Sequence, residues 1–295
     1  MSYQPIPEES AHLIEVGDTR VHLIDLGDLA ATPVVFLHGG GPGCNSWTDW
    51  QQVGENLGES YRRLYMDFPY YGGSSSTPVR GPSWSGLADL VRNTLEALEI
   101  SHAHFVCQSF GGAAAIVLAV EHPELFLSLS VTGTVLTRGV LTPPTADHVV
   151  RDAVGPYLDG GPSREKMRAM LAAVEWVDQA SIPDELVEAR YQASASKDHI
   201  DRYVTQPDVL GDAQDFENLL HRNNVPTLLA YGDRDPFAPA DVPLYLFTRI
   251  PSARLVLVKN ASHHFPEEIP DTYRAILEPW LAEHQTPSAT FQSRP

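Results

Sequence analysis

The stretch "HFVCQSFGGAAAIVLAV", residues 104–120, decides the fold. Its first residues form an almost unbroken apolar run, as in a strand buried on both faces, and an apolar, helix-like segment begins at Ser109. A serine at such a corner lies at the amino end of a helix, where backbone N–H groups favour developing negative charge. Gly111 and Gly112 remove side chains where the helix must pass close to its neighbours. The corner therefore predicts an exposed, strained hydroxyl, with a plain helix N-cap as the alternative.

The segments around this corner predict the sheet. Strand-like aliphatic runs alternate with helix-length segments, such as residues 86–100, whose apolar residues recur at helical spacing. Alternation of this kind predicts an α/β protein with a mostly parallel central sheet flanked by helices. The strand-like runs are residues 21–27, 33–39, 61–68, 102–108, 127–133, 226–232 and 254–259.

The alternation stops between about Thr137 and His221. This part of the chain contains "SREKMRAMLAAVEWV" and "PDELVEARYQAS", which are helix-like, and no convincing strand. An all-helical insertion between two strands predicts a helical cap over one end of the sheet. We therefore expect a core of residues 1–136 and 222–285, a cap of residues 137–221 and a disordered tail of residues 286–295.

Composition limits the partners. The 295 residues include 20 Lys and Arg against 38 Asp and Glu, a formal net charge of −18, which argues against nucleic acid and anionic membranes. Two cysteines, Cys44 and Cys107, cannot form a disulfide framework, and the N-terminal residues lack the pattern of a signal peptide. We expect a soluble, cytoplasmic protein with a small-molecule substrate, and the sequence is compatible with a homo-oligomer.

Two later loops offer partners for the serine. A serine hydroxyl is a weak nucleophile unless a base takes its proton and a third group orients that base. The loop after residues 226–232 offers Asp233 and Asp235, and the loop after residues 254–259 offers His263 and His264. Each follows a predicted strand, and the order serine, aspartate, histidine predicts a hydrolytic triad.

A glycine run supplies the remaining electrostatic element. "FLHGGGPGCNSW" follows the predicted strand 33–39, and glycine lets backbone approach a substrate oxygen closely. The N–H groups of Gly40 and Phe110 are the candidate oxyanion hole. A phosphate-binding loop is disfavoured, because no Lys-Ser/Thr pair follows the glycines.

These motifs resemble the α/β-hydrolase superfamily over essentially the whole chain. The elbow G-x-S-x-G of that fold is present as Cys107-Gln108-Ser109-Phe110-Gly111, with cysteine at its first position. The string "HGGGPG" followed by "CNSWTDW" is similar to the meta-cleavage-product hydrolases, which break a carbon–carbon bond in 2-hydroxy-6-oxo-dienoic acids. This resemblance implies Ser109 as nucleophile, His263 as general base and Asp235 as its orienting carboxylate.

The same resemblance implies a set of substrate-binding residues. Arg190, in "DELVEARYQAS", takes the position of an arginine that grips the substrate carboxylate. Gln108 and Asp49 stand where the family commonly has asparagine, and His264 where it often has tryptophan. Asp49 would repel a dienoate unless it is protonated or paired. The expected substrate-binding residues are Arg190, Gly39, Gly41, Asp49, Gln108 and His264.

The predicted function is hydrolysis through a serine-centred triad, with carbon–carbon cleavage of a 2-hydroxy-6-oxo-dienoate-type compound as the favoured reaction. No metal or organic cofactor is expected, because side chains supply nucleophile, base and electrostatic stabilisation. A carboxylesterase or lactonase is the alternative on the same residues. A proline iminopeptidase is a weaker one, because its similar loop lacks the third glycine. A small-molecule receptor built on a hydrolase body is the non-enzymatic alternative.

Overall fold

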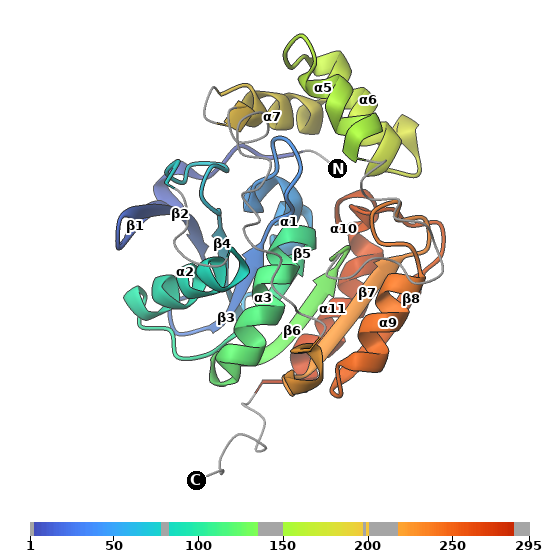
Figure 1. Ribbon diagram of the computed structural model, residues 1–295. Coiled ribbons are helices and arrows are strands. Elements are labelled where there is room, and N and C mark those ends of the chain that lie inside the picture. The colour runs from blue at the N-terminus through green and yellow to red at the C-terminus, as the bar shows by residue number, and fades with distance from the viewer. Residues whose placement is uncertain (1–2, 78–82, 135–149, 197–198, 201–217, 286–295) are drawn as a thin grey trace.

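The computed structural model describes residues 3–77, 83–134, 150–196, 199–200 and 218–285. Its centre is an eight-stranded sheet in the order β1-β2-β4-β3-β5-β6-β7-β8 (Figure 1). β2 pairs antiparallel with β1 and with β4, and all other neighbours pair parallel. The strands are β1 Ala11–Val16, β2 Thr19–Leu26, β3 Thr32–Leu37, β4 Tyr61–Met66, β5 Ala103–Gln108, β6 Phe126–Thr132, β7 Thr227–Gly232 and β8 Ala253–Val258.

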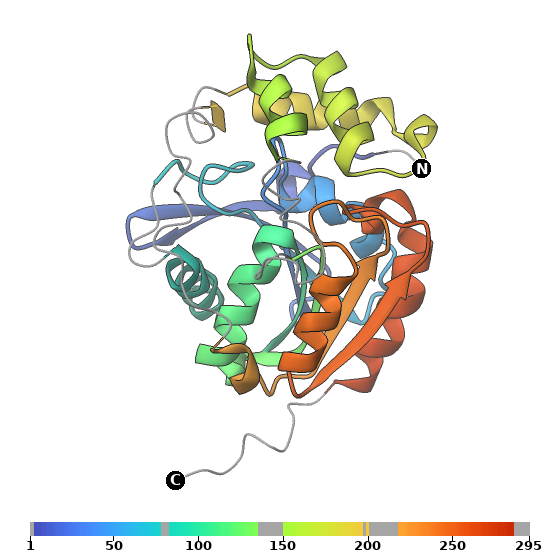
Figure 2. The same cartoon turned by 45° about the vertical axis from the view of Figure 1, so that its right-hand side comes forward.

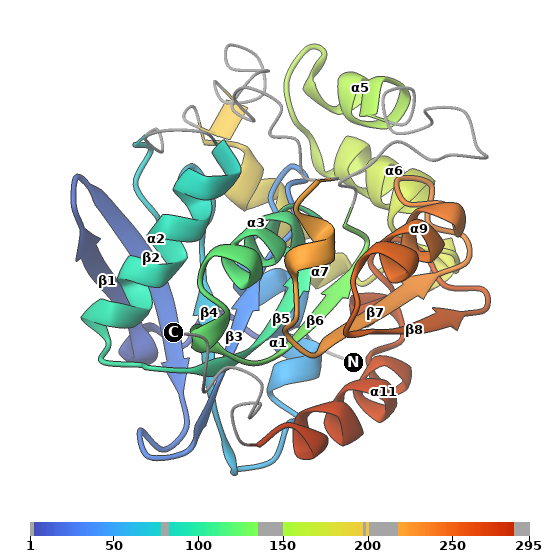
Figure 3. The same ribbon diagram turned by 60° about the horizontal axis from the view of Figure 1, so that its bottom comes forward.

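Helices cover both faces of the sheet, as the sequence predicts. Figure 3 shows α2, α3 and α9 on one side and α1 and α11 on the other. Each side has its own apolar core, the first built around the alanine-rich face of α3 and the second around Trp50 and Trp280. The helices are α1 Ser46–Gly54, α2 Ser83–Ala97, α3 Ser109–Glu121, α5 Gly155–Leu158, α6 Arg164–Val174, α7 Asp184–Ser194, α9 Asp241–Arg249, α10 Phe265–Glu268 and α11 Pro270–Glu283. In the described part of the chain, no helix has both the length and the apolar character to cross a membrane.

The chain between β6 and β7 is helical where it is described. Helices α5, α6 and α7 form a separate layer above the sheet (Figure 2), and they share a small core that includes Met167, Leu171 and Leu186. Ser163 begins α6 by accepting a hydrogen bond from the backbone N–H of Lys166. A helical insertion at this point was predicted from the sequence. Its exact limits remain a prediction, and the expected tail, residues 286–295, lies outside the described residues.

Two glycines allow the tight corner between β5 and α3. A Cβ on Gly111 would lie 2.7 Å from the Cβ of Leu37, and a Cβ on Gly112 would lie 1.9 Å from the Oγ1 of Thr134. The new helix therefore passes so close to the ends of β3 and β6 that side chains do not fit at these two positions. This contact fixes where α3 begins, and with it the position of Ser109.

We expect Gly112→Ala to destabilise the fold by about 1–3 kcal/mol, because the added methyl group displaces Thr134. The free energy of unfolding, measured by urea denaturation, checks this. Gly58→Ala is the matched control, since a Cβ there meets nothing within 4 Å, and we expect it to change stability by less than about 0.5 kcal/mol. Equal effects of the two substitutions would contradict the close packing at this corner.

Candidate active site

Ser109 occupies the first position of α3, directly after β5. Its φ is 47°, in the left-handed region that non-glycine residues rarely adopt. Its backbone carbonyl accepts a hydrogen bond of 3.0 Å from the Oγ1 of Thr134. Because such a conformation costs of order 1–3 kcal/mol, the surrounding contacts must hold it. Ser109 is partly exposed, so its hydroxyl is presented at the carboxyl edge of the sheet.

Asp235 and His263 meet at the same edge from the loops after β7 and β8. The Nδ1 of His263 lies 2.8 Å from the Oδ2 of Asp235, and both side chains are buried. The other oxygen of Asp235 accepts hydrogen bonds from the N–H groups of Phe237 and Ala238, at 2.8 and 2.9 Å. Since these bonds fix the carboxylate, Oδ2 is free to accept from the histidine ring. The neighbouring candidate, Asp233, instead pairs with Lys259 at the surface.

Two contacts bring the loop of His263 to the corner that carries Ser109. Gln108 donates a hydrogen bond of 3.1 Å from its Nε2 to the carbonyl of His263. Gly133, at the end of β6, has a φ of 60°, and a Cβ there would lie 2.7 Å from the Cε1 of His263. Gln108 thus holds the histidine backbone through its Nε2, and its predicted substrate contact stays a prediction.

The environment of His263 favours its protonated form. Burial by itself lowers the pKa of the ring, but the charge and hydrogen bond of Asp235 outweigh burial, and Glu175 and Asp49 act in the same direction. The pKa of His263 therefore lies above the ordinary value of 6.5. A base of this kind is neutral above its pKa and holds the proton strongly once it has accepted it.

The glycine run after β3 lies against the start of α3. A Cβ on Gly40 would lie 3.2 Å from the Cβ of Phe110. The hydroxyl of Tyr71 donates to the carbonyl of Gly40 at 2.7 Å, and the ring of His38 bonds to the carbonyl of Gly39 at 2.6 Å. The structure thus places Gly40, in the glycine run, beside Phe110 at the start of α3. The bonds from Tyr71 and His38 to the carbonyls of Gly40 and Gly39 hold the glycine run in place.

Arg190 is completely buried. Its relative exposure is 0%, and its guanidinium forms ion pairs with Asp49, at 3.0 Å, and with Glu175. It also donates to the Sγ of Cys44. The second oxygen of Asp49 accepts from the N–H of Gly39 at 2.8 Å. Asp49 and Arg190, both expected to bind the substrate, are therefore bonded to each other in a buried cluster that lies against the glycine run.

His264 joins this cluster to Glu267, and its ring centroid lies 5.3 Å from that of His263. Its Nδ1 lies 2.7 Å from the Oε1 of Glu267, and burial lowers the pKa of His264 to about 4 and raises that of Glu267 to about 7. Ligating atoms of Asp49, His264 and Glu267 lie within 4.8 Å of one another, a set that could hold a metal ion. The guanidinium of Arg190 already supplies a positive charge to Asp49. We therefore interpret the set as part of an ion-paired cluster.

Sequence reasoning missed Glu175, which links the cap to the loop of His263. Its carbonyl accepts hydrogen bonds from the N–H of His264, at 3.3 Å, and from the hydroxyl of Ser262. The carboxylate of Glu268 accepts in turn from the N–H groups of Val177 and Asp178, at 2.9 and 2.7 Å. The cap is thus hydrogen-bonded to Ser262 and His264, the residues on both sides of His263. No local signal marks Glu175, since its partners lie far away in the sequence.

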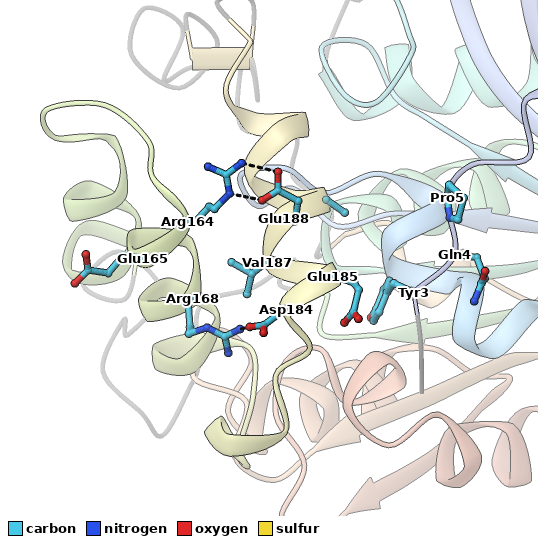
Figure 4. Close-up of a pocket in the computed structure, with 11 residues that line it drawn as sticks. Tyr3, Gln4, Pro5, Arg164, Glu165, Arg168, Asp184, Glu185, Val187 and Glu188 are labelled. Atoms are coloured by element: carbon cyan, nitrogen blue, oxygen red, sulfur yellow. Dashed lines mark hydrogen bonds and ion pairs between the residues drawn. The ribbon is translucent and has the colours of Figure 1, made fainter.

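A cavity of about 800 Å³ lies elsewhere, between the N-terminal segment and the cap helices α6 and α7 (Figure 4). Arg164 pairs there with Glu188, and Arg168 with Asp184. Its described lining residues include neither Ser109 nor His263. This cavity is therefore distinct from the site at the carboxyl edge of the sheet.

Comparison with known proteins identifies the fold. A family model described as alpha/beta hydrolase fold matches residues 32–270, which is most of the chain. The chain belongs to the α/β-hydrolase family. The α/β-hydrolase fold predicted from the elbow and the strand order is thereby confirmed. In this α/β-hydrolase, Ser109, Asp235 and His263 follow the strands in the order typical of the fold.

Curated relatives of this α/β-hydrolase share a narrow group of names. A 2-hydroxymuconate semialdehyde hydrolase from Pseudomonas sp. strain CF600 is 30% identical over 288 residues, covering 95% of this chain and 96% of the relative. A 2-hydroxy-6-oxononadienedioate/2-hydroxy-6-oxononatrienedioate hydrolase from Cupriavidus pinatubonensis is 30% identical over 258 residues, 85% and 87% of the two chains. The predicted resemblance to meta-cleavage-product hydrolases is therefore confirmed at the level of the family.

Solved structures give the same fold. A meta-cleavage product hydrolase from Pseudomonas fluorescens IP01 has a TM-score of 0.78 and 25% identity, covering 90% of this α/β-hydrolase and 95% of that chain. An esterase from Rhodococcus sp. ECU1013 has a TM-score of 0.76 at 18% identity, covering 93% and 99%. The second likeness shows the fold alone.

Proposed function

We propose that this α/β-hydrolase cleaves its substrate through an acyl-enzyme formed on Ser109. His263 accepts the proton of the Ser109 hydroxyl as the oxygen attacks a carbonyl carbon, and it then gives that proton to the leaving group. Asp235 holds the ring in the required tautomer, with its proton on Nδ1. Water, activated by the same histidine, hydrolyses the acyl-enzyme. The buried bond of 2.8 Å between His263 and Asp235, at the edge where Ser109 is presented, carries this proposal.

The N–H groups of Gly40 and Phe110 are the proposed oxyanion hole. The close approach of these two residues, 3.2 Å from the Cβ position on Gly40 to the Cβ of Phe110, supports the assignment. Their N–H groups would stabilise the oxyanion that forms as Ser109 attacks. The bond from Tyr71 to the carbonyl of Gly40 helps to fix this loop before the substrate arrives.

Two bonds are candidates for cleavage. The names of the curated relatives favour the carbon–carbon bond of a 2-hydroxy-6-oxo-dienoate, whose remote 6-oxo group would be the carbonyl attacked. One observation favours an ester or a lactone: Arg190, the expected partner of the dienoate carboxylate, is already paired with Asp49 and Glu175. We therefore place ester or lactone hydrolysis first and carbon–carbon hydrolysis second.

A stopped-flow comparison of two substrates separates these candidates. We expect the purified enzyme to hydrolyse p-nitrophenyl butanoate and to leave the chromophore of 2-hydroxy-6-oxo-6-phenylhexa-2,4-dienoate largely unchanged. Faster loss of the dienoate than of the ester would place carbon–carbon hydrolysis first. Tight binding of either compound with no Ser109-dependent turnover would instead favour a receptor.

The pKa of His263 predicts the pH dependence of the reaction. Because a protonated ring cannot accept the proton of Ser109, we expect kcat/KM to fall about tenfold per pH unit well below that pKa. Since Asp235 raises the pKa, the midpoint of the profile should lie above 6.5. The measurement is kcat/KM for a p-nitrophenyl ester from pH 5 to pH 9. A midpoint clearly below 6.5 would contradict the assignment of His263 as the base.

A further inference from the structure

The cluster around Arg190 bears on the charge of the substrate. Arg190 donates to the carboxylates of Asp49 and Glu175, and its exposed fraction is zero. Two carboxylates thus face one guanidinium, so that the three side chains carry a formal charge of −1 before Glu267 is counted. Both terminal nitrogens of the guanidinium are thus engaged, by Asp49 and Cys44 on one and by Glu175 on the other, while its buried Nε has no partner in the described part of the chain. A ligand carboxylate that needs the terminal nitrogens would have to compete with these partners.

The cluster lies against the glycine run, next to the corner that carries Ser109. A Cβ on Gly39 would lie 3.5 Å from the Oδ2 of Asp49 and 3.8 Å from the Cβ of Ser109. A Cβ on Gly41 would lie 3.4 Å from the Oε1 of Glu175. The two carboxylates therefore lie against the glycine run, and that of Asp49 lies close to the same position as the side chain of Ser109.

The negative charge of the cluster also affects the pKa of His263. Burial lowers the pKa of His263, and the charges of Glu175 and Asp49 are among those that raise it. Negative charge that stabilises the protonated ring of His263 also repels an anion bound beside that ring. A substrate carboxylate would have to displace one of two buried partners of Arg190, and breaking a buried ion pair is strongly unfavourable.

We propose that this hydrolase selects acyl compounds that carry no carboxylate at the end bound beside the glycine run, and that the Arg190–Asp49–Glu175 cluster enforces this selection. The proposal rests on the proposed function of Ser109. It names the substrate class as uncharged esters, lactones or ketones, in contrast to the dienoic acids in the names of the relatives. Asp49 and Glu175 act as specificity determinants, because they convert an anion-binding arginine into an internal ion pair.

A matched pair of esters tests the proposal. The p-nitrophenyl ester of pentanoic acid and the mono-p-nitrophenyl ester of glutaric acid differ only at the end of the acyl chain. The first ends in a methyl group and the second in a carboxylate. We expect the wild type to prefer the pentanoate by about 100-fold in kcat/KM. In Asp49→Asn/Glu175→Gln, which removes the two negative charges that pair with Arg190, the preference should narrow to about tenfold or less. Glu185→Gln, which removes one exposed charge from α7, should leave the wild-type ratio unchanged.

The opposite result overturns the proposal. In that case the wild type would turn over the two esters at comparable rates, and Arg190→Gln would lose activity on the glutarate ester alone. That result would make Arg190 a carboxylate-binding residue. The wild-type comparison requires no variant, so a misfolded double variant does not affect it. Calorimetric titration with glutarate gives a readout without turnover, and we expect no saturable binding by the wild type. Absence of Ser109-dependent hydrolysis of either ester would contradict the proposed function, while the titration would still decide the charge selectivity.

Discussion

Ser109→Ala is expected to lower kcat for ester hydrolysis by about 10⁶-fold, because the residues of a triad act as one unit and the nucleophile has no substitute. The remaining activity would come from water attacking a carbonyl bound near Gly40 and Phe110. The measurement is initial-rate kinetics on a p-nitrophenyl ester, with mass spectrometry to detect an acyl adduct on the wild type alone. The fold should persist, since the side chain that is lost is small and partly exposed.

Controls separate the loss of the nucleophile from a change in the corner. Ser101→Ala, at an exposed position before β5, should keep wild-type kinetics. Ser109→Gly should be as inactive as Ser109→Ala but more stable by of order 1 kcal/mol, because glycine adopts a φ of 47° without strain. A Ser109→Ala protein that retained more than about one hundredth of wild-type activity would exclude Ser109 as the nucleophile.

The fold could be predicted because its signals are local. The buried run that ends at Ser109, the two glycines after it and the alternation of strands and helices are all short-range patterns. All seven predicted strand-like runs correspond to strands of the sheet. β1, Ala11–Val16, was not predicted, because it is an edge strand in which no residue is fully buried, and Leu13 is 53% exposed. Such a strand lacks the continuous apolar run that marks the buried ones.

The candidate site was predictable only in part, for the same physical reason. Ser109, Asp235 and His263 each follow a strand, and parallel strands bring their carboxyl ends to one edge of the sheet. The state of Arg190 depends on partners that are distant in sequence, since Asp49 is 141 positions away. The sequence raised the need for a partner to Asp49 without identifying it. Glu175 carries no motif, and it acquires its position only when the cap folds onto the core.

Asp235→Asn is expected to lower kcat/KM by about 10⁴-fold, through the tautomer of His263. The Oδ1 of Asp235 accepts from the N–H groups of Phe237 and Ala238, and an asparagine oxygen would keep these bonds. The amide NH₂ would then point at the Nδ1 of His263 and force the ring proton onto Nε2. A ring protonated at Nε2 cannot accept the proton of Ser109.

The pH profile distinguishes this effect from a general loss of structure. Without the carboxylate, burial dominates, so the pKa of His263 should fall and the midpoint of the residual activity should move to lower pH than in the wild type. Asp233→Asn is the matched control in the same loop, because Asp233 pairs with Lys259 at the surface, and its activity should stay within about twofold of the wild type. If Asp233→Asn proved the more damaging substitution, the carboxylate of the triad would have to be reassigned. If Asp235→Asn kept the wild-type midpoint, the charge of Asp235 would not be what raises the pKa of His263, and the charges of Glu175 and Asp49 would have to account for it.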